Sequence, residues 1–271
     1  MYMNNLEEDK VSIIIATYNR FSFLLNTIKT VKEQTYKNIE IIVINDCSSQ
    51  KEYYDYDFET NGVKIIHLEK NSKVIHGFAC PGGYQRNFGI GISTGKYIAF
   101  CDDDDVWFPD KLKLQINQMK NTDCKMSCTE ALIGKGVFNQ DKKYLKYNAE
   151  YAFVYITNVY KGTPFFKNGT FPIIWNLEFL QKNNCCICSS VVIEKTVIEK
   201  TGMFKSLPTA DDYEYWLRIL EHTNCVYIPI PCVYYDSGHG DGQNYNTTQE
   251  TIREQNKTYT LWKPNNYNNN L

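Results

Sequence analysis

The chain has 271 residues, of which 43% are hydrophobic, and its formal net charge is -2. This length suits one large α/β domain or two small ones. The balanced charge favours neither a nucleic-acid partner nor an anionic membrane, and no hydrophobic run approaches the ~20 residues that a membrane span needs. The polar start M-Y-M-N-N-L-E-E-D-K is unlike a signal peptide, so a cytoplasmic location is expected.

A polar leader over residues 1–10 precedes an alternation of strand and helix patterns. Strand-forming residues occupy 11–16, 39–44 and 63–68, and a fourth run spans 97–100. Helical spacing follows the first strand, and further helices are expected over 86–92 and after Pro109. This alternation predicts βαβ units, and therefore an α/β fold with a Rossmann-like, mostly parallel central sheet and flanking helices in a single domain.

Polar residues follow three of the predicted strands, at Thr17–Arg20, Asp46–Ser49 and Asp102–Asp105. Right-handed crossovers bring the carboxyl ends of parallel strands to one edge, which is where open α/β sheets bind ligands. Four successive aspartates repel one another, so we expect Mg²⁺ or Mn²⁺ there, together with a phosphate-bearing substrate. An acidic loop that caps the next helix is the alternative.

Neither G-x-x-x-x-G-K-[ST] nor an early G-x-G-x-x-G is present, which excludes a P-loop and disfavours a dinucleotide fold. In the less periodic second half, we expect strands over 126–132, 189–193 and 225–230. Helices are expected over 194–201, from Asp211, and from Thr247 to Lys263. The aromatic residues of 138–176 either stack on sugar rings or pack against the core. The Asn-rich tail 264–271 is expected to be disordered.

Ten cysteines are scattered along the chain. Cys185, Cys186 and Cys188 form C-C-x-C, which is compatible with zinc, but no second pair has finger spacing. We therefore expect buried free thiols in a reducing compartment.

Five segments, in this order, resemble the family 2 glycosyltransferases of GT-A fold: V-S-I-I-I-A-T-Y-N-R (11–20), I-I-V-I-N-D-C-S-S (41–49), Q-R-N-F-G-I (85–90), G-K-Y-I-A-F-C-D-D-D-D (95–105) and A-D-D-Y-E-Y-W-L-R-I (210–219). The resemblance runs from residue 11 to about 240. It implies a glycosyltransferase domain over 11–263, with a nucleotide-binding half to about 105 and an acceptor and catalytic half from about 106.

On the donor side, the resemblance implies that Thr17, Tyr18 and Arg20 line the nucleotide pocket. Asp46 would accept a hydrogen bond from the nucleobase, and Arg86 would lie near the diphosphate.

For the metal and the acceptor, the resemblance also names residues. Asp102 and Asp104 match the outer positions of the family's D-x-D, with Asp102 facing the ribose and Asp104 on the metal; Asp103 is expected among the nucleotide-binding residues. Asp212 matches the catalytic base of the family's E-D pair, with Asp211 in place of the usual Glu. His239 matches a late histidine that helps to hold the metal, although the usual preceding Arg is missing; a surface or core histidine is the alternative.

The expected function is therefore metal-dependent, inverting transfer of a sugar from a nucleotide-diphosphate sugar, with a UDP-sugar as the first choice, to a hydroxyl of a glycan, lipid or protein acceptor. A metal and an Arg offset the charge of the leaving diphosphate, and a carboxylate takes the acceptor's proton. Direct displacement with one base predicts inversion. A non-catalytic sugar-nucleotide- or glycan-binding module and a nucleotidyltransferase are the alternatives. The former would not need Asp212, and the latter usually has an early basic Gly-rich loop, which Thr17–Arg20 is not.

Overall fold

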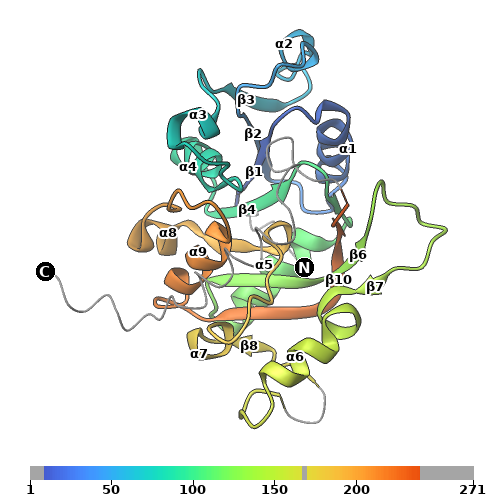
Figure 1. Cartoon of the computed structure of the whole chain (residues 1–271), viewed down its shortest axis with the longest axis vertical. Helices are drawn as coiled ribbons and strands as arrows, with labels where there is room; N and C mark the ends of the chain where they lie inside the picture. The colour runs from blue at the N-terminus through green and yellow to red at the C-terminus, as the bar shows by residue number, and fades with distance from the viewer. Residues whose placement is uncertain (1–8, 167–169, 239–271) are drawn as a thin grey trace, which may run out of the picture.

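A computed structural model describes residues 9–166 and 170–238, shown in Figure 1. Its strands form one sheet in the order β3-β2-β1-β4-β9-β6-β10-β5, with β7 paired to β6 and β8 paired to β10. The strands are β1 (Val11–Thr17), β2 (Ile39–Asn45), β3 (Val63–His67), β4 (Tyr97–Asp102), β5 (Val106–Trp107), β6 (Met126–Gly134), β7 (Leu145–Lys146), β8 (Ile174–Trp175), β9 (Val192–Glu194) and β10 (Cys225–Asp236).

Helices flank this sheet. They are α1 (Phe21–Lys32), α2 (Glu52–Asp55), α3 (Ser72–His76), α4 (Gly83–Ile92), α5 (Lys111–Thr122), α6 (Phe153–Val159), α7 (Leu177–Leu180), α8 (Lys195–Thr201) and α9 (Asp211–Ile219). A π-helix, η1 (Tyr147–Tyr151), precedes α6, and a 3-10 turn, η2 (Cys188–Ser190), precedes β9. No helix of the described residues is both long enough and apolar enough to cross a membrane.

The sheet is mostly parallel, as the sequence predicts. β1 pairs in parallel with β2 and β4, β2 with β3, and β6 with β10. The short β9 is antiparallel to both β4 and β6, and two antiparallel pairings in succession restore the direction. The carboxyl ends of β1, β2, β4, β6 and β10 therefore point to the same edge of the sheet, where the candidate site lies.

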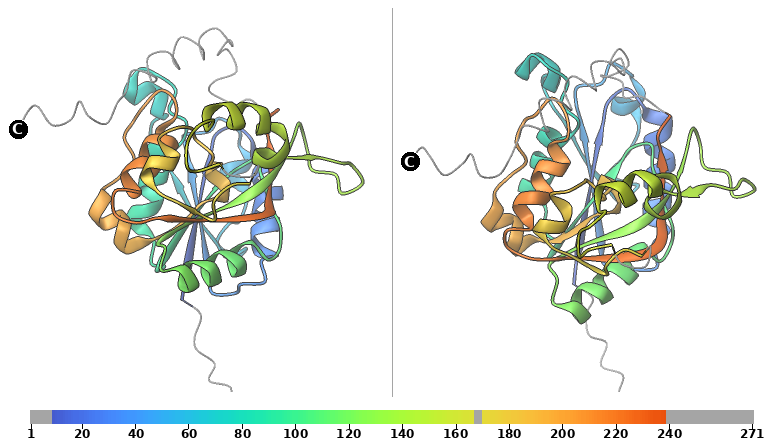
Figure 2. Two further views of the ribbon diagram at one scale, coloured as in Figure 1. Left: turned by 90° about the horizontal axis from the view of Figure 1, so that it is seen from below. Right: turned by 60° about the horizontal axis from the view of Figure 1, so that its bottom comes forward.

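Successive side chains of a strand point to opposite faces of the sheet, and they pack into two hydrophobic cores, one on each face. In β1, Ile13 and Ile15 join the core that contains Leu24 of α1 and Leu112 of α5, whereas Ile14 joins the core that contains Trp216 of α9. Figure 2 shows α5 on one side of the sheet and α6 on the other. Both faces being covered explains why the central strands are almost entirely hydrophobic.

Several predicted boundaries in the second half are wrong. β10 continues to Asp236, beyond the expected end at Ile230, because Pro231 lies at a register irregularity where the strand does not need a regular ladder. The strand expected over 189–193 is the turn η2 followed by the short β9. The expected helix 247–263 and the tail lie outside the described residues, as does most of the leader.

The aromatic segment 138–176 contains η1, α6 and β8, and much of it packs against the core. Tyr160 stacks on Phe179, with ring centroids 4.6 Å apart, and Trp175 stacks on Tyr227 at 4.3 Å. Tyr155 is exposed. The core-packing interpretation thus holds for Tyr160 and Trp175.

Candidate functional site

The three polar strand ends meet at one edge of the sheet, as predicted. The backbone N–H of Asp46, after β2, donates to the carbonyl oxygen of Thr17 at the end of β1, at 3.0 Å. Arg20, which follows β1, reaches the aspartates that follow β4. A fourth strand end joins them, because the backbone N–H of Asp236 at the end of β10 donates to Asp105 Oδ1 at 2.9 Å.

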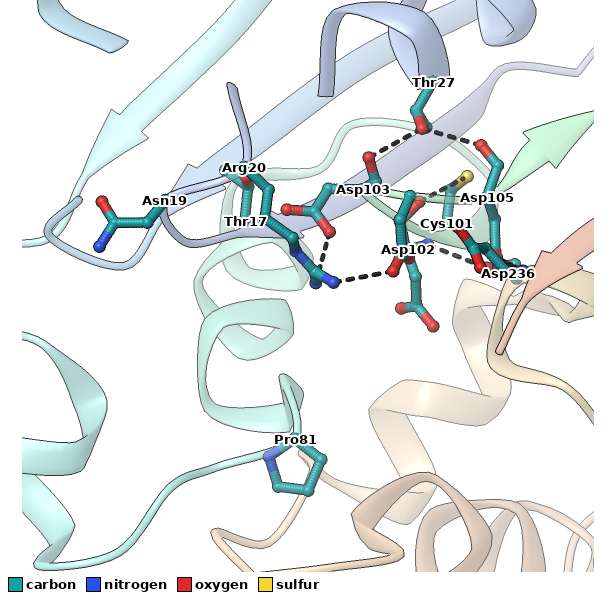
Figure 3. Close-up of polar contacts among 12 residues, drawn as sticks. Thr17, Asn19, Arg20, Thr27, Pro81, Cys101, Asp102, Asp103, Asp105 and Asp236 are labelled. Atoms are coloured by element: carbon teal, nitrogen blue, oxygen red, sulfur yellow. Dashed lines mark hydrogen bonds and ion pairs between the residues drawn. The ribbon is translucent and has the colours of Figure 1, made fainter. Parts of the chain in front are cut away.

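Arg20 is the principal cation inside the aspartate cluster (Figure 3). Its Nη2 lies 2.6 Å from Asp103 Oδ1 and its Nη1 lies 2.7 Å from Asp104 Oδ2. Its backbone N–H donates to the hydroxyl of Tyr53 at 3.0 Å, and that hydroxyl also lies 2.5 Å from Thr17 Oγ1. Tyr53 was not predicted as a site residue, because it lies in a polar stretch without a recognisable motif.

The four aspartates divide into two pairs. Asp103 and Asp105 are fully buried, and the hydroxyl of Thr27 donates to both of their carbonyl oxygens, at 3.0 and 2.8 Å (Figure 3). Asp102 and Asp104 keep more exposed surface, 28% and 8% of their side chains. The buried pair therefore shapes the loop, and the outer pair of the D-x-D is the more accessible.

Burial and repulsion by neighbouring carboxylates raise the pKa of Asp103, Asp104 and Asp105. The pKa of Asp104 rises to about 8, because burial and the charges of Asp103 and Asp102 outweigh the opposing effect of Arg20. Burial and the charges of Asp104 and Asp102 raise the pKa of Asp105 well above its usual value. Arg20 alone therefore does not balance the cluster, and a further cation would favour the ionised carboxylates.

The donor chemistry fits a hard divalent cation, since Asp102 and Asp104 offer oxygen ligands with exposed surface. Within 9–166 and 170–238, however, no three acidic, histidine or cysteine side chains converge on one point. A metal at Asp104 would compete with Arg20 for the same carboxylate, and its remaining ligands would come from substrate oxygens or from residues outside these ranges. His239 is one such residue, so its predicted role falls outside the described residues.

Arg86 belongs to α4, and its side chain contacts the aspartate cluster. It is buried, and its Nη2 donates to Asp102 Oδ1 at 2.5 Å while its Nη1 donates to the carbonyl oxygen of Pro81 at 3.3 Å. Gly82 has a φ of +120°, which favours glycine, and a Cβ there would also come within 2.8 Å of the Arg86 guanidinium. Burial alone would lower the pKa of Arg86, but Cys188, Asp102 and other nearby acidic groups raise it, so Arg86 stays charged.

Asp211 and Asp212 begin α9 and have different environments. Asp211 is buried, and its Oδ2 accepts the backbone N–H of Gly83 at 2.7 Å. Asp212 is half-buried, and among the residues that the structure describes its Oδ1 accepts the N–H of the next residue, Tyr213, at 2.6 Å. Neither is the N-cap, which is Ala210. Asp211 is thus held by α4, whereas Asp212 is partly exposed.

The pKa of Asp212 differs from the expectation for a helix start. A helix N-terminus favours the ionised form of a carboxyl, but burial and the charge of Asp211 raise the pKa of Asp212 to about 7, with Arg86 opposing them. A pKa near 7 suits a group that accepts and releases a proton at neutral pH.

Asp46 is already well supplied with hydrogen-bond donors. Its Oδ1 accepts the N–H of Ser72 at 2.8 Å, and its Oδ2 accepts the Ser72 hydroxyl at 2.7 Å and the Asn71 amide at 3.1 Å. These bonds fix the start of α3, a contact that sequence reasoning missed.

Two tyrosines outside the predicted set border the site. Tyr147 begins η1 and Tyr235 lies in β10, and their rings pack edge to face at 6.0 Å. Burial raises the pKa of both, and the charge of Asp212 adds to this for Tyr147, as that of Asp105 does for Tyr235. Tyr235 precedes Asp236, which donates to Asp105, so this ring pair borders the aspartate cluster. Tyr18, by contrast, is half-buried after β1.

Comparison with known proteins identifies the family. The sequence profile described as "Glycosyl transferase family 2" matches residues 12–195. The Escherichia coli "UDP-Glc:alpha-D-GlcNAc-diphosphoundecaprenol beta-1,3-glucosyltransferase WfaP" is 31% identical in an alignment of length 255 that covers 91% of this chain and 84% of that protein. The "Putative teichuronic acid biosynthesis glycosyltransferase TuaG" of Bacillus subtilis is 26% identical over 216 residues, covering 78% of this chain and 72% of TuaG.

Solved structures share the fold at low sequence identity. S. aureus TarS 1–349 in complex with UDP-GlcNAc superposes with a TM-score of 0.62 at 15% identity, covering 90% of this chain and 64% of that one. The mannosyltransferase PcManGT from Pyrobaculum calidifontis, in complex with GDP-Man and Mn²⁺, gives a TM-score of 0.61 at 12% identity, covering 95% and 66%. The predicted GT-A fold is thus confirmed. With the family profile and the WfaP match, the chain belongs to glycosyl transferase family 2 and is a glycosyltransferase.

Proposed function

We propose that this glycosyltransferase transfers a sugar from a UDP-sugar to a hydroxyl of a lipid-linked glycan, with inversion at the anomeric carbon, in glycan synthesis. The main support for this proposal is that the site holds both Asp212, whose pKa is about 7, and the charged Arg86, which contacts Asp102. The names of WfaP and of the TarS complex support the choice of UDP, and the name of WfaP supports a diphosphate-lipid acceptor. The reaction is assigned to the cytoplasm, consistent with ten free cysteines.

On the donor side, Thr17, Tyr18 and Arg20 line the nucleotide pocket. The base donates a hydrogen bond to the carboxylate of Asp46, which Ser72 and Asn71 hold in place. Asp102 faces the ribose. Arg86, whose charge is secured by its acidic surroundings, offsets the charge that develops on the leaving diphosphate.

Asp104, assisted by Asp102 and by His239, is the proposed holder of Mn²⁺ or Mg²⁺. The cation would supply positive charge next to the diphosphate. Arg20 would then keep its contact with Asp103, which is the shorter of its two ion pairs at 2.6 Å. Asp103 therefore contributes by positioning Arg20.

In the transfer step, the acceptor oxygen attacks the anomeric carbon while the bond from that carbon to the diphosphate oxygen breaks. Asp212 takes the proton of the acceptor hydroxyl as the new bond forms. One base acting in a direct displacement gives inversion. A purely sugar-nucleotide-binding protein of the same fold would gain nothing from a proton acceptor at this place.

A donor screen tests the proposal. The protein is incubated with UDP-, dTDP- and GDP-sugars and a short-chain diphosphate-lipid glycan, with Mn²⁺ or with EDTA, and the products are identified by mass spectrometry and by the coupling constant of the anomeric proton. We expect transfer from a UDP-sugar with Mn²⁺ only, and an inverted linkage. Melting curves run beside it should show stabilisation by UDP and Mn²⁺, amounting to about 2.7 kcal/mol at a ~100-fold excess over Kd. No stabilisation with any nucleotide and metal, together with no transfer, would refute the proposal.

A further inference from the structure

A basic hairpin, residues 135–146, leaves the sheet at the same edge as the candidate site. It connects β6 to β7 and projects from the body of the protein (Figures 1 and 2). It contains four lysines and a single acidic residue, Asp141, although the whole chain has a net charge of -2. The lysines are Lys135, Lys142, Lys143 and Lys146.

The charges of the basic hairpin are available to a partner. Lys135, Lys142 and Lys143 are exposed, and no ion pair of the described residues involves any lysine of the hairpin. A positive surface that the fold does not neutralise attracts anions over a distance of about a Debye length.

The same hairpin exposes two aliphatic side chains. Val137 is 65% exposed and Leu145 is 52% exposed, one on each arm. Immediately beyond the hairpin, Tyr151, Val154 and Tyr155 of η1 and α6 are also exposed. Aliphatic and aromatic side chains interleaved with lysines are typical of surfaces that lie at the lipid headgroup boundary.

The base of the hairpin is fixed to the body. The Phe138 ring contacts the rings of Phe108, Tyr144 and Tyr234, with centroids 5.2 to 5.6 Å apart. The hydroxyl of Tyr234 donates to the carbonyl oxygen of Gly136 at 2.7 Å. The N–H of Gly136 donates to Asp236 Oδ1 at 2.9 Å, next to the aspartate cluster. The exposed lysines are therefore presented by a packed element whose position relative to the site is defined.

We propose that the basic hairpin docks on a bilayer that contains anionic lipids. Lysine ammonium groups contact the anionic headgroups, and Val137 and Leu145 enter the headgroup boundary. Nucleic acid is a less suitable partner. It would contact the lysines but not the exposed aliphatic side chains, and the hairpin has no arginine for bidentate phosphate contacts.

Docking would bring the edge of the sheet that carries the site toward the membrane. β7 of the hairpin runs directly into η1, whose first residue, Tyr147, packs against Tyr235 beside the aspartate cluster. A lipid-linked acceptor would therefore meet the protein where it touches the bilayer. Only this consequence rests on the proposed function; vesicle binding itself does not.

The test is vesicle co-sedimentation of the full chain. Vesicles of phosphatidylcholine alone are compared with vesicles that contain about one-third phosphatidylglycerol, at low and high salt. We expect binding to the anionic vesicles only, and its loss at high salt. Each lysine near an anionic surface contributes about a fivefold factor in affinity, so Lys142→Gln/Lys143→Gln should weaken binding about 10- to 30-fold. Val137→Ser/Leu145→Ser should weaken binding without changing its salt dependence.

A matched control is Lys29→Gln/Lys32→Gln, which removes two exposed lysines from the end of α1 instead. It should bind like the wild type. All variants should keep the melting shift with UDP and Mn²⁺ and the transfer to a water-soluble acceptor. Equal weakening by the control, no preference for anionic vesicles, or binding to RNA but not to vesicles would overturn the membrane inference. Normal transfer without vesicle binding would do so while leaving the proposed function intact.

Discussion

Replacing Asp212 with Asn tests the proposed catalytic base most directly. Asn keeps the size of the side chain and one oxygen that accepts the N–H of Tyr213, a bond of 2.6 Å in the structure. It removes only the carboxylate that takes the proton. Asp211→Asn is the matched comparison, because it removes a carboxylate from the adjacent position of the same helix.

The magnitudes follow from the surroundings of the two carboxyls. Loss of a general base lowers kcat by roughly 10²- to 10⁴-fold. The pKa of Asp212 is raised from 3.8 to about 7 by burial and by Asp211, which corresponds to destabilisation on the order of 4 kcal/mol at pH 8. Asp212→Asn should therefore unfold no more easily than the wild type. Removing the charge of Asp211 lowers the pKa of Asp212, so Asp211→Asn should stay active further into the acidic range.

The assay is sugar transfer to a true acceptor between pH 5 and pH 9, with melting curves and UDP binding measured in parallel. For the wild type, kcat should rise about tenfold per pH unit below pH 7 and level off above it, since the base must be ionised. Asp212→Asn should lack this dependence and bind UDP normally. Near-normal transfer by Asp212→Asn, with Asp211→Asn inactive though folded, would transfer the role to Asp211 and refute our reasoning.

Three further predictions concern the metal, a buried lysine and the thiols. Asp104→Asn should lose most of the Mn²⁺-dependent part of the melting shift with UDP, since it removes a charged oxygen ligand; an unchanged shift would place the metal elsewhere in the cluster. Burial lowers the pKa of Lys111 to about 7, so the free energy of unfolding of the wild type, relative to Lys111→Met, should increase by about 2 kcal/mol from pH 7 to pH 9. Denaturant titrations at both pH values measure this, and a constant difference would contradict the lowered pKa. A thiol count on unfolded, unreduced protein should approach ten, the number of free cysteines in the structure, and a deficit in pairs would mean disulfides.

The order of elements and the edge that carries the site could be predicted from the sequence. Hydrophobic runs such as Val11–Ala16, separated by helical spacing, predict a mostly parallel α/β sheet, and parallel strands have their carboxyl ends at one edge. The accumulation of Asp102–Asp105 at one such end was therefore informative without coordinates. The strand predicted over 225–230 is shorter than β10 for a local reason. A proline such as Pro231 usually ends a strand, and the sequence does not show that this one lies at a bulge.

Only the tertiary structure decided how these residues differ from one another. Asp211 and Asp212 are adjacent carboxylates in the sequence. In the structure, the N–H of Gly83, which lies 128 residues away from Asp211, donates to Asp211, whereas Asp212 stays partly exposed. In the same way Ser72 engages Asp46, and Arg20 pairs with Asp103 and Asp104. Net charge also hid the basic hairpin, because a sum over the chain carries no information about position. Hydrogen bonding, burial and local potential depend on neighbours in space, and long-range folding alone sets those neighbours.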